Sequence, residues 1–345
     1  MSSAVATPVR PVVALADAGA HRRLERRHRM RMVGGRLVFA VCALVLISML
    51  VFAATQALPG SAAERALGEY STDETLVAAV ERQMGLDRPV VEQYLDWASG
   101  AIRLDFGNAL ANQRSVWSMV QSPLQNSLLL MGVAWITTNT LGIGLGIAAA
   151  SRRESRFDHV LSNVMAALSA VPGFVFAIGL IFLLATGVFH VFRPVSLIPA
   201  DDLAWQHLDL LVLPTMALVL DSVSYCYRTT RRLVAEAMQS DYVEMAILKG
   251  VPPRRVLLRH AFPNAAAPLV QVLAISALYL LSGIVVIEMV FSYPGIGRTL
   301  VSSVSVLDSP MIQCIVMIQA GAFLVVSLGA DLLSLRLSPR RWSVR

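Results

Sequence analysis

Runs of about twenty apolar residues recur along this chain, and they limit its possible folds more than any other feature. A helix of that length crosses the hydrocarbon core of a bilayer, and it satisfies its own backbone hydrogen bonds there. We therefore predict an all-α polytopic membrane protein with six transmembrane helices. The predicted spans are 37–57, 125–149, 160–185, 210–229, 265–290 and 311–332.

The composition agrees with a membrane protein. Hydrophobic residues make up 56% of the 345 residues and charged residues only 15%, whereas soluble domains carry about 25% charged residues. This excludes a soluble enzyme, a disordered tail protein and a nucleic-acid-binding domain, so we expect no nucleic acid partner. The cysteines lie in or beside apolar runs without CxxC spacing, which is typical of small core residues rather than of a metal site or a disulfide.

The distribution of basic residues predicts the orientation in the membrane. Most of the 29 Lys and Arg residues lie before the first run, in the second and fourth loops, and in the tail. Because basic loops remain on the inner side, we expect both termini in the cytoplasm. The predicted parts are an Arg-rich, partly disordered extension at 1–36 with an uncleaved anchor behind it, a six-span domain at 37–332, and a cytoplasmic tail at 333–345.

The segment 59–124 is too long to be a simple connector, and this orientation places it outside. Its acidic residues outnumber its arginines. A helix is predicted from Thr72, which can cap it, to Gly85, which can close it. A second short helix is predicted from Pro89 through Trp97. We interpret the segment as a small folded outer cap.

The segment 228–264 is the second large loop, and it is basic and predicted to face the cytoplasm. Asp241 is expected to cap a short helix, with Glu244 completing a capping box. Lys249 suits the negative end of that helix, and Gly250 suits the left-handed closing position. These residues alone leave two interpretations open, a rigid lever exposed to the cytoplasm and an amphipathic loop lying on the lipid headgroups.

The prolines of the inner loop predict a second helix. Pro252 and Pro253 interrupt the first helix but can open a new one. We expect this second helix to run from Arg254 to Ala261, because Pro263 lacks the backbone N–H needed to continue it.

The inner loop resembles the EAA loop of ABC importer permeases, in particular those of the dipeptide/oligopeptide/nickel branch, whose usual form is close to DYVxxARxKGxxxxxVxxxHAxxNA. Met245 and Ile247 depart from this pattern, because Ala and Arg are common there. The matching residues are Asp241, Tyr242, Val243, Ala246, Lys249, Gly250, Val256, His260, Ala261, Asn264 and Ala265.

Other motifs extend the resemblance over almost the whole chain, with residues 1–35 outside it. The outer segment is similar to the cap of the B-type permease, and the C-terminal end departs from the family's final DPR by Ser338. The motifs are Gly85–Pro89, Gln93-Tyr94, Trp97, Asp105–Gly107, an SxPxF stretch at Ser169–Phe174, an ExxF…PGxG turn at Glu288–Phe291 and Pro294–Gly297, and Asp331 with Leu337–Arg340.

The resemblance implies a type I ABC importer permease fold in a bacterial plasma (inner) membrane, and a subunit that forms half of the pathway for di- or oligopeptides. It implies a heterodimer with a C-type permease, two ATPase subunits or domains, and an extracytoplasmic solute-binding protein. ATP and Mg²⁺ would bind to the ATPases, because this chain has no Walker-type motif and is not expected to be an enzyme. The ATPase-coupling residues implied are Asp241, Tyr242, Glu244, Ala246, Lys249 and Gly250.

Acidic residues inside predicted spans are candidates for function, because burying a charge in a membrane is costly. For Asp221 the alternative is a structural acid bonded to a neighbouring helix, and we interpret Glu288 as a structural or gate residue rather than a substrate ligand. We predict no catalytic residue, no metal site and no bound cofactor. The candidate pathway or gate residues are Asp221, Glu288, Phe291, Pro294 and Gly295.

Other functions remain open from the sequence. Within the same class the alternative cargo is nickel or another metal chelate. A secondary transporter that does not use ATP would be expected to have internal repeats and coupling acids at mid-membrane, and the chain offers one such acid and no repeat. A membrane scaffold or signalling protein would have no use for the 241–250 pattern.

Overall fold

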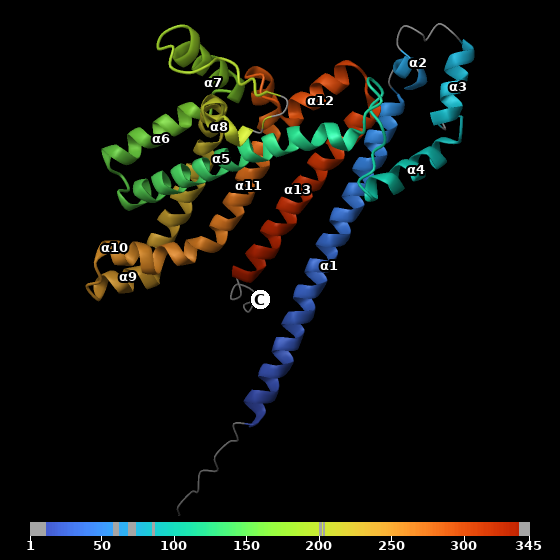
Figure 1. Ribbon diagram of the computed structural model, residues 1–345. Coiled ribbons are helices and arrows are strands. Elements are labelled where there is room, and N and C mark those ends of the chain that lie inside the picture. Colours follow the sequence, from blue (N-terminus) through green and yellow to red (C-terminus); the bar gives the residue numbers. More distant parts are fainter. Residues whose placement is uncertain are drawn as a thin grey trace, which may run out of the picture. The chain divides into compact units, whose positions relative to one another are not determined.

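The computed structural model describes residues 12–57, 62–67, 74–84, 87–199, 202 and 204–337. These residues are almost entirely helical (Figure 1). The α-helices are α1 (Val12–Gln56), α2 (Ala62–Leu67), α3 (Glu74–Met84), α4 (Val90–Ile102), α5 (Val116–Ser151), α6 (Arg156–Leu168), α7 (Gly173–Leu180), α8 (Leu208–Met238), α9 (Asp241–Leu248), α10 (Pro253–Val256), α11 (Phe262–Val290), α12 (Ile296–Ser305) and α13 (Ser309–Leu337).

The chain divides into two compact units, residues 1–43 and residues 44–345. Helix α1 begins at Val12, so the described part of the predicted extension 1–36 is helical rather than disordered. The physical reason is composition, because the Ala, Leu and Arg residues that crowd this stretch are strong helix formers. Residues 1–11 of the extension and 338–345 of the tail lie outside the described residues.

Among the described residues, five helices are long and apolar enough to cross a membrane, and a bent pair would make a sixth span. The straight candidates are Val33–Gln56, Val116–Ser151, Leu208–Met238, Pro268–Val290 and Ser309–Ser334. Their positions agree with five of the six predicted runs, although the helices extend further at several ends.

The third predicted span, 160–185, is not one straight helix. It consists of α6 and α7, which meet at an angle of 96°. Pro172 stands at the start of α7 with an extended backbone (φ −63°, ψ 146°). Because proline cannot donate a hydrogen bond and disfavours a helical residue before it, the break falls at this position.

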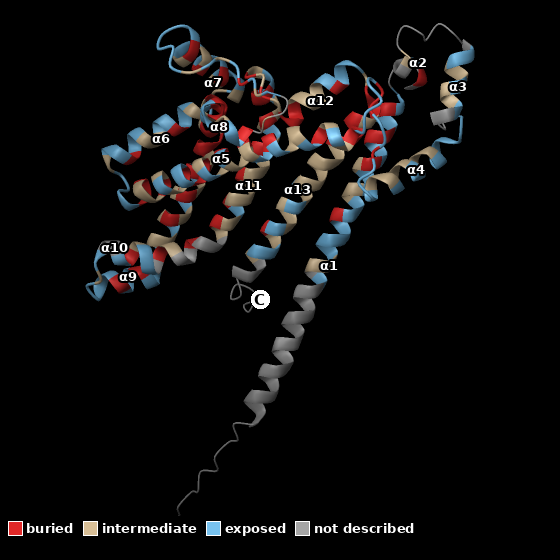
Figure 2. Cartoon of the chain, viewed as in Figure 1, coloured by how far each residue is buried: buried red, intermediate tan, exposed pale blue. Residues whose placement is uncertain are grey.

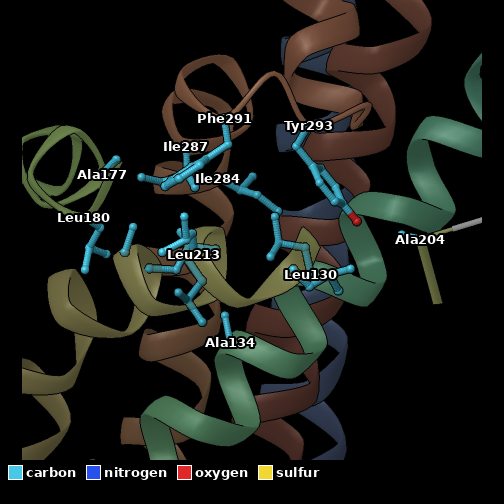
Figure 3. Close-up of a cluster of buried hydrophobic side chains, with 14 of the residues drawn as sticks. Leu130, Ala134, Ala177, Leu180, Ala204, Leu213, Ile284, Ile287, Phe291 and Tyr293 are labelled. Atoms are coloured by element: carbon cyan, nitrogen blue, oxygen red, sulfur yellow. The ribbon is translucent and has the colours of Figure 1, made fainter. Parts of the chain in front are cut away.

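Helix α8 is at the centre of the larger unit. In its most apolar stretch 72% of the residues are buried, against 22% to 33% for the other straight candidate spans. The main core surrounds it, where Leu213 of α8 packs with Leu130 of α5, Leu180 of α7 and Ile284 of α11 (Figure 3). Much of the surface of the other spans is therefore left free to face lipid or another subunit (Figure 2).

The described part of the outer segment contains three short helices. Helix α3 lies within the predicted range Thr72–Gly85, but Thr72 and Gly85 themselves lie outside the described residues. Helix α4 confirms the second predicted helix and continues five residues beyond Trp97, to Ile102. Helix α2 was not predicted, because a run of six residues carries too little apolar periodicity to be recognised.

Candidate functional site

The inner loop forms a short helix, α9, directly after the central helix α8. Ser240, rather than the predicted Asp241, is its N-cap residue, and its hydroxyl donates back to the carbonyl of Ala237 at 2.6 Å. Asp241 is therefore the first helical residue, and the predicted capping box with Glu244 is wrong. Both acids still lie in the first turn, where negative charge stabilises the positive end of a helix.

The end of α9 confirms the prediction for Gly250, whose φ is +75°. The N–H of Gly250 donates to the carbonyl oxygen of Ile247 at 2.9 Å, and the N–H of Val251 donates to the carbonyl oxygen of Ala246 at 3.2 Å. These two bonds are those of a Schellman motif, and Val251 also packs against the cluster that contains Ala246. The chain therefore turns back sharply at a defined angle.

After this turn the second helix begins at Pro253, one residue before the predicted start, but it does not end before Pro263. Helix α10, a π-helical turn at Leu257–Ala261, and α11 follow one another without a gap. The π turn includes a bond from the N–H of Phe262 to the carbonyl of Leu257. A π turn leaves backbone groups outside the usual i→i−4 pattern, so the missing backbone N–H of a proline is tolerated next to it.

Helix α9 has one inward face and a larger outward one. Val243 and Ala246 are buried in a cluster with Val256 and Ala261. Ala246 was expected to allow close docking of an ATPase, but its side chain faces inward and allows close approach between α9 and the helix beneath it. The exposed residues are Asp241, Tyr242, Glu244, Met245, Ile247, Leu248, Lys249 and Gly250.

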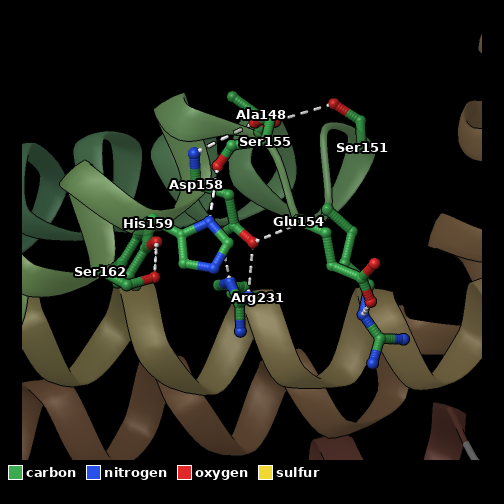
Figure 4. Close-up of polar contacts among 10 residues, drawn as sticks. Ala148, Ser151, Glu154, Ser155, Asp158, His159, Ser162 and Arg231 are labelled. Carbon is green, nitrogen blue, oxygen red and sulfur yellow. Dashed lines mark hydrogen bonds and ion pairs between the residues drawn. The ribbon is translucent and has the colours of Figure 1, made fainter.

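A buried ion pair connects α6, which precedes the break in the third span, with α8. Both oxygens of Asp158 accept from Arg231, at 2.5 Å from Nε and 2.6 Å from the terminal nitrogen (Figure 4). Asp158 is almost fully buried, while a third of the Arg231 side chain remains exposed. The hydroxyl of Tyr227 lies 3.0 Å from that of Ser162 on the same pair of helices. The N-terminal half of α6 is therefore held to α8.

Glu288 lies in a closed polar cluster at the other end of the spans. Its carboxylate accepts from the Ser127 hydroxyl and from the N–H groups of Gly297, at 2.8 Å, and Arg298, at 3.1 Å. The N–H of Ile296 donates to the same Ser127 oxygen at 2.8 Å. Glu288 and Ser127 together satisfy the first three N–H groups of α12, which would otherwise lack partners.

The residues around Glu288 are equally enclosed. Phe291 is fully buried in the main core, and a Cβ atom on Gly295 would overlap the Glu288 carboxylate. The side-chain amide of Asn126 on α5 donates to the carbonyl of Pro294 at 3.0 Å. The backbone carbonyl of Asn126 accepts from the hydroxyl of Tyr293 at 2.8 Å. Burial, with the nearby Glu288, raises the pKa of Tyr293, so this hydroxyl remains a donor. In the described part of the chain, these predicted gate residues support a turn.

Asp221 differs from the other acids in the spans. It is partly buried on α8 and makes no hydrogen bond or ion pair within the described residues. Its carboxylate lies against Gly173, at the start of α7, and near Gly283 of α11, where a Cβ atom would come within 3.0 Å and 3.7 Å of its oxygens. The acid therefore lies beside the break in the third span.

Some of these contacts could not be read from the sequence. The Ser155–Asp158 spacing does fit a capping pattern, and Ser155 accepts from the N–H of Asp158 at 3.2 Å. Nothing local indicates that Asn126 and Ser127 hold a turn more than 160 residues away. No group of three or more metal-ligating side chains occurs among the described residues.

Comparison with known proteins adds independent findings. The model of the binding-protein-dependent transport system inner membrane component family matches residues 142–343, and the N-terminal model of such membrane components matches residues 29–128. The chain is 30% identical over 309 residues to a probable peptide ABC transporter permease protein of Sinorhizobium fredii, covering 88% of this chain and 97% of that protein. It is 31% identical over 304 residues to a glutathione transport system permease protein of Salmonella choleraesuis, covering 88% and 96%.

Proposed function

Since the chain belongs to the binding-protein-dependent transport system inner membrane components, the permease subunits of ABC importers, we propose that it forms half of the translocation pathway for di- or oligopeptides. It is a membrane-spanning subunit rather than an enzyme, and the family implies ATPase and binding-protein partners. We propose that the second half of the pathway is a C-type permease, and that two ATPase subunits or domains bind on the cytoplasmic side.

The observation that carries this proposal is the geometry of α9. The helix is fixed at one end by α8 and at the other by the Schellman turn and Val256, while Tyr242, Met245 and Leu248 point outward. An apolar surface on a rigid, braced helix suits docking into a groove of a partner protein. The same residues on an unbraced loop would transmit little motion.

Co-purification tests the docking. We expect the chain carrying both Met245→Ser and Leu248→Ser to retain the second permease but to lose the ATPase subunits. Leu258→Ser is a matched control, because Leu258 is also an exposed leucine of the inner loop but lies on the π-helical turn. Retention of the ATPases by the double variant at wild-type levels would contradict the proposal for α9.

The cargo is proposed from the relatives, whose names mention peptides and glutathione. Uptake of radiolabelled di- and tripeptides into proteoliposomes that contain the whole importer, including its binding protein, tests this class. Uptake of a nickel chelate but not of peptides would favour the alternative, a metal-chelate importer.

We also propose that both termini and the inner loop lie in the cytoplasm, with residues 59–124 outside. The distribution of basic residues supports this orientation. A cysteine introduced at Asn108 should react with a membrane-impermeant maleimide in intact cells or spheroplasts. Labelling only after the membrane is permeabilised would show that the orientation is the opposite of the one proposed.

Asp221 is our candidate for a residue of the pathway. A partly buried acid without a partner among the described residues, beside a broken span, supports this role. We expect Asp221→Asn to change the relative uptake of cationic and neutral peptides while ATPase association is unchanged. Equal loss of uptake for both peptide classes would indicate a structural acid instead.

A further inference from the structure

Helix α4 presents three different faces, and none of its residues is fully buried. Tyr94 and Trp97 point toward α1 and form a cluster of rings with Phe52, at centroid distances of 5.5 Å and 5.7 Å. The second face is polar and contains Glu92, Asp96 and Ser99. The third is apolar and contains Val91, Leu95, Ala98 and Ile102.

The apolar face has no partner within the described part of the chain. Val91, Leu95 and Ile102 are 69%, 58% and 86% exposed. Their spacing of four and seven residues aligns them along one side of the helix. The polar face, in contrast, carries the ion pair of Asp96 with Arg88 at 2.8 Å. If water surrounded both free faces of the helix, polar and apolar residues would not be expected to occupy separate faces.

The contacts of α4 with α1 show how deep α4 lies. Gln93 accepts from Gln56, the last residue of α1, at 2.9 Å. The hydroxyl of Tyr94 lies 2.8 Å from that of Ser48, eight residues earlier in the same span. At 1.5 Å per residue, Ser48 is about 12 Å along the span from Gln56. Helix α4 therefore lies beside the outer part of a membrane-spanning segment rather than beyond its end (Figure 1).

We propose that α4 is an interfacial helix that lies in the headgroup region of the bilayer, with Val91, Leu95 and Ile102 in contact with acyl chains. The three faces then match three surroundings, namely the span α1, lipid and water. Tyr94 and Trp97 lie at the depth where amphipathic aromatic side chains concentrate in membrane proteins. Apolar burial of about 5–10 Å below the headgroup boundary is typical of such helices.

Fluorescence quenching distinguishes lipid from water and from protein. Single cysteines would be placed at Leu95 and Ile102, with Asp96 and Ser99 as matched controls on the polar face, after Cys42, Cys226 and Cys314 are replaced by alanine. Each variant would be purified with its partner subunits, labelled with a bimane dye and reconstituted in nanodiscs. Quenching by brominated phospholipid and by iodide in water would then be compared.

We expect the ratio of bromolipid quenching to iodide quenching to be several-fold higher at 95 and 102 than at 96 and 99. Equal iodide quenching at all four positions would overturn the proposal, because the apolar face would then be in water. Protection of 95 and 102 from both quenchers would also overturn it, since another protein subunit would cover this face. None of these outcomes depends on which cargo the importer carries.

Discussion

The Glu288 turn and the α9 loop lie at opposite ends of one run of helix, and they use polar and apolar residues in opposite ways. At the Glu288 turn, a carboxylate is fully enclosed and every oxygen has a donor. At α9, the acids are exposed and two small apolar side chains face inward, while larger ones face outward. The polar groups of the Glu288 turn have hydrogen-bond partners within the chain, whereas α9 keeps an exposed surface.

This difference separates stability from function. Replacing a buried acid whose oxygens all accept hydrogen bonds costs much folding free energy, because its donors are left without an acceptor. An exposed helix end can be changed with little effect on folding, so its residues are free to be selected for a partner. Substitutions should therefore affect mainly stability at the first region and mainly coupling at the second.

The largest effect is expected for Glu288→Ala. This change leaves the N–H groups of Gly297 and Arg298 and the Ser127 hydroxyl without an acceptor, at about 1–3 kcal/mol for each group. We expect little folded protein in detergent by fluorescence-detected size-exclusion chromatography. Glu288→Gln keeps one acceptor oxygen and should be intermediate. A wild-type elution profile for Glu288→Ala would show that the turn does not depend on this acid.

A smaller loss of stability is expected for Asp158→Asn, which removes the partner of Arg231 at the inner end of α6. Because part of Arg231 remains exposed, the cost should lie below the roughly 3–5 kcal/mol that is typical of breaking a fully buried pair. The melting temperature of the purified importer would measure it. Arg232→Gln is the control, since its pair with Glu236 is exposed and should contribute at most about 1 kcal/mol.

Gly250→Val should affect coupling more than folding. A Cβ atom at this position meets no atom within 4 Å, so the cost comes only from backbone strain, about 1–3 kcal/mol. We expect the variant to assemble with the second permease but to lose substrate-stimulated ATPase activity. Gly250→Asn should retain more activity, because asparagine tolerates the left-handed region. Full transport by Gly250→Val would show that the angle of this turn is not needed for coupling.

The smallest effect on stability is expected for Glu244→Arg. The charge reversal near the start of α9 should cost about 0.3–1 kcal/mol through the helix dipole, and it breaks no capping bond of α9. ATPase stimulation should nevertheless fall, because the exposed residue lies on the proposed docking surface. Glu244→Gln should cause a smaller loss of stimulation. If both variants behaved like wild type, Glu244 would lie outside the contact with the ATPases.

Features that depend on neighbours in sequence could be predicted. The apolar runs predicted the positions and order of the five straight candidate spans, and Gly250 after a short helix predicted the left-handed turn. The exact start of α5 could not be predicted, because Val116 and Val120 are buried by Phe106 and by α13 rather than by lipid. A window of average hydropathy does not detect such an amphipathic turn.

Contacts between distant segments were beyond local patterns. Arg231 was counted as a charge that marks the inner side, yet it is paired with Asp158, 73 residues earlier. The support of the Glu288 turn by Asn126 and Ser127 likewise depends on the packing of α5 against α11 and α12. The capping of α9 was predicted wrongly for a different reason, because Ser240 and Asp241 are both good caps and only tertiary structure selects between them.

The unbroken run of helix from Pro253 to Val290 has a mechanical consequence. At 1.5 Å per residue it is a rod of about 57 Å, which begins beside the Gly250 turn and ends next to the residues that Glu288 holds. Helices bend mainly at prolines and at π turns, so part of a tilt imposed near α9 is expected to be absorbed at the π turn at Leu257–Ala261. The helix beyond this turn is expected to carry the remaining displacement to the far end, because it cannot yield as a loop does.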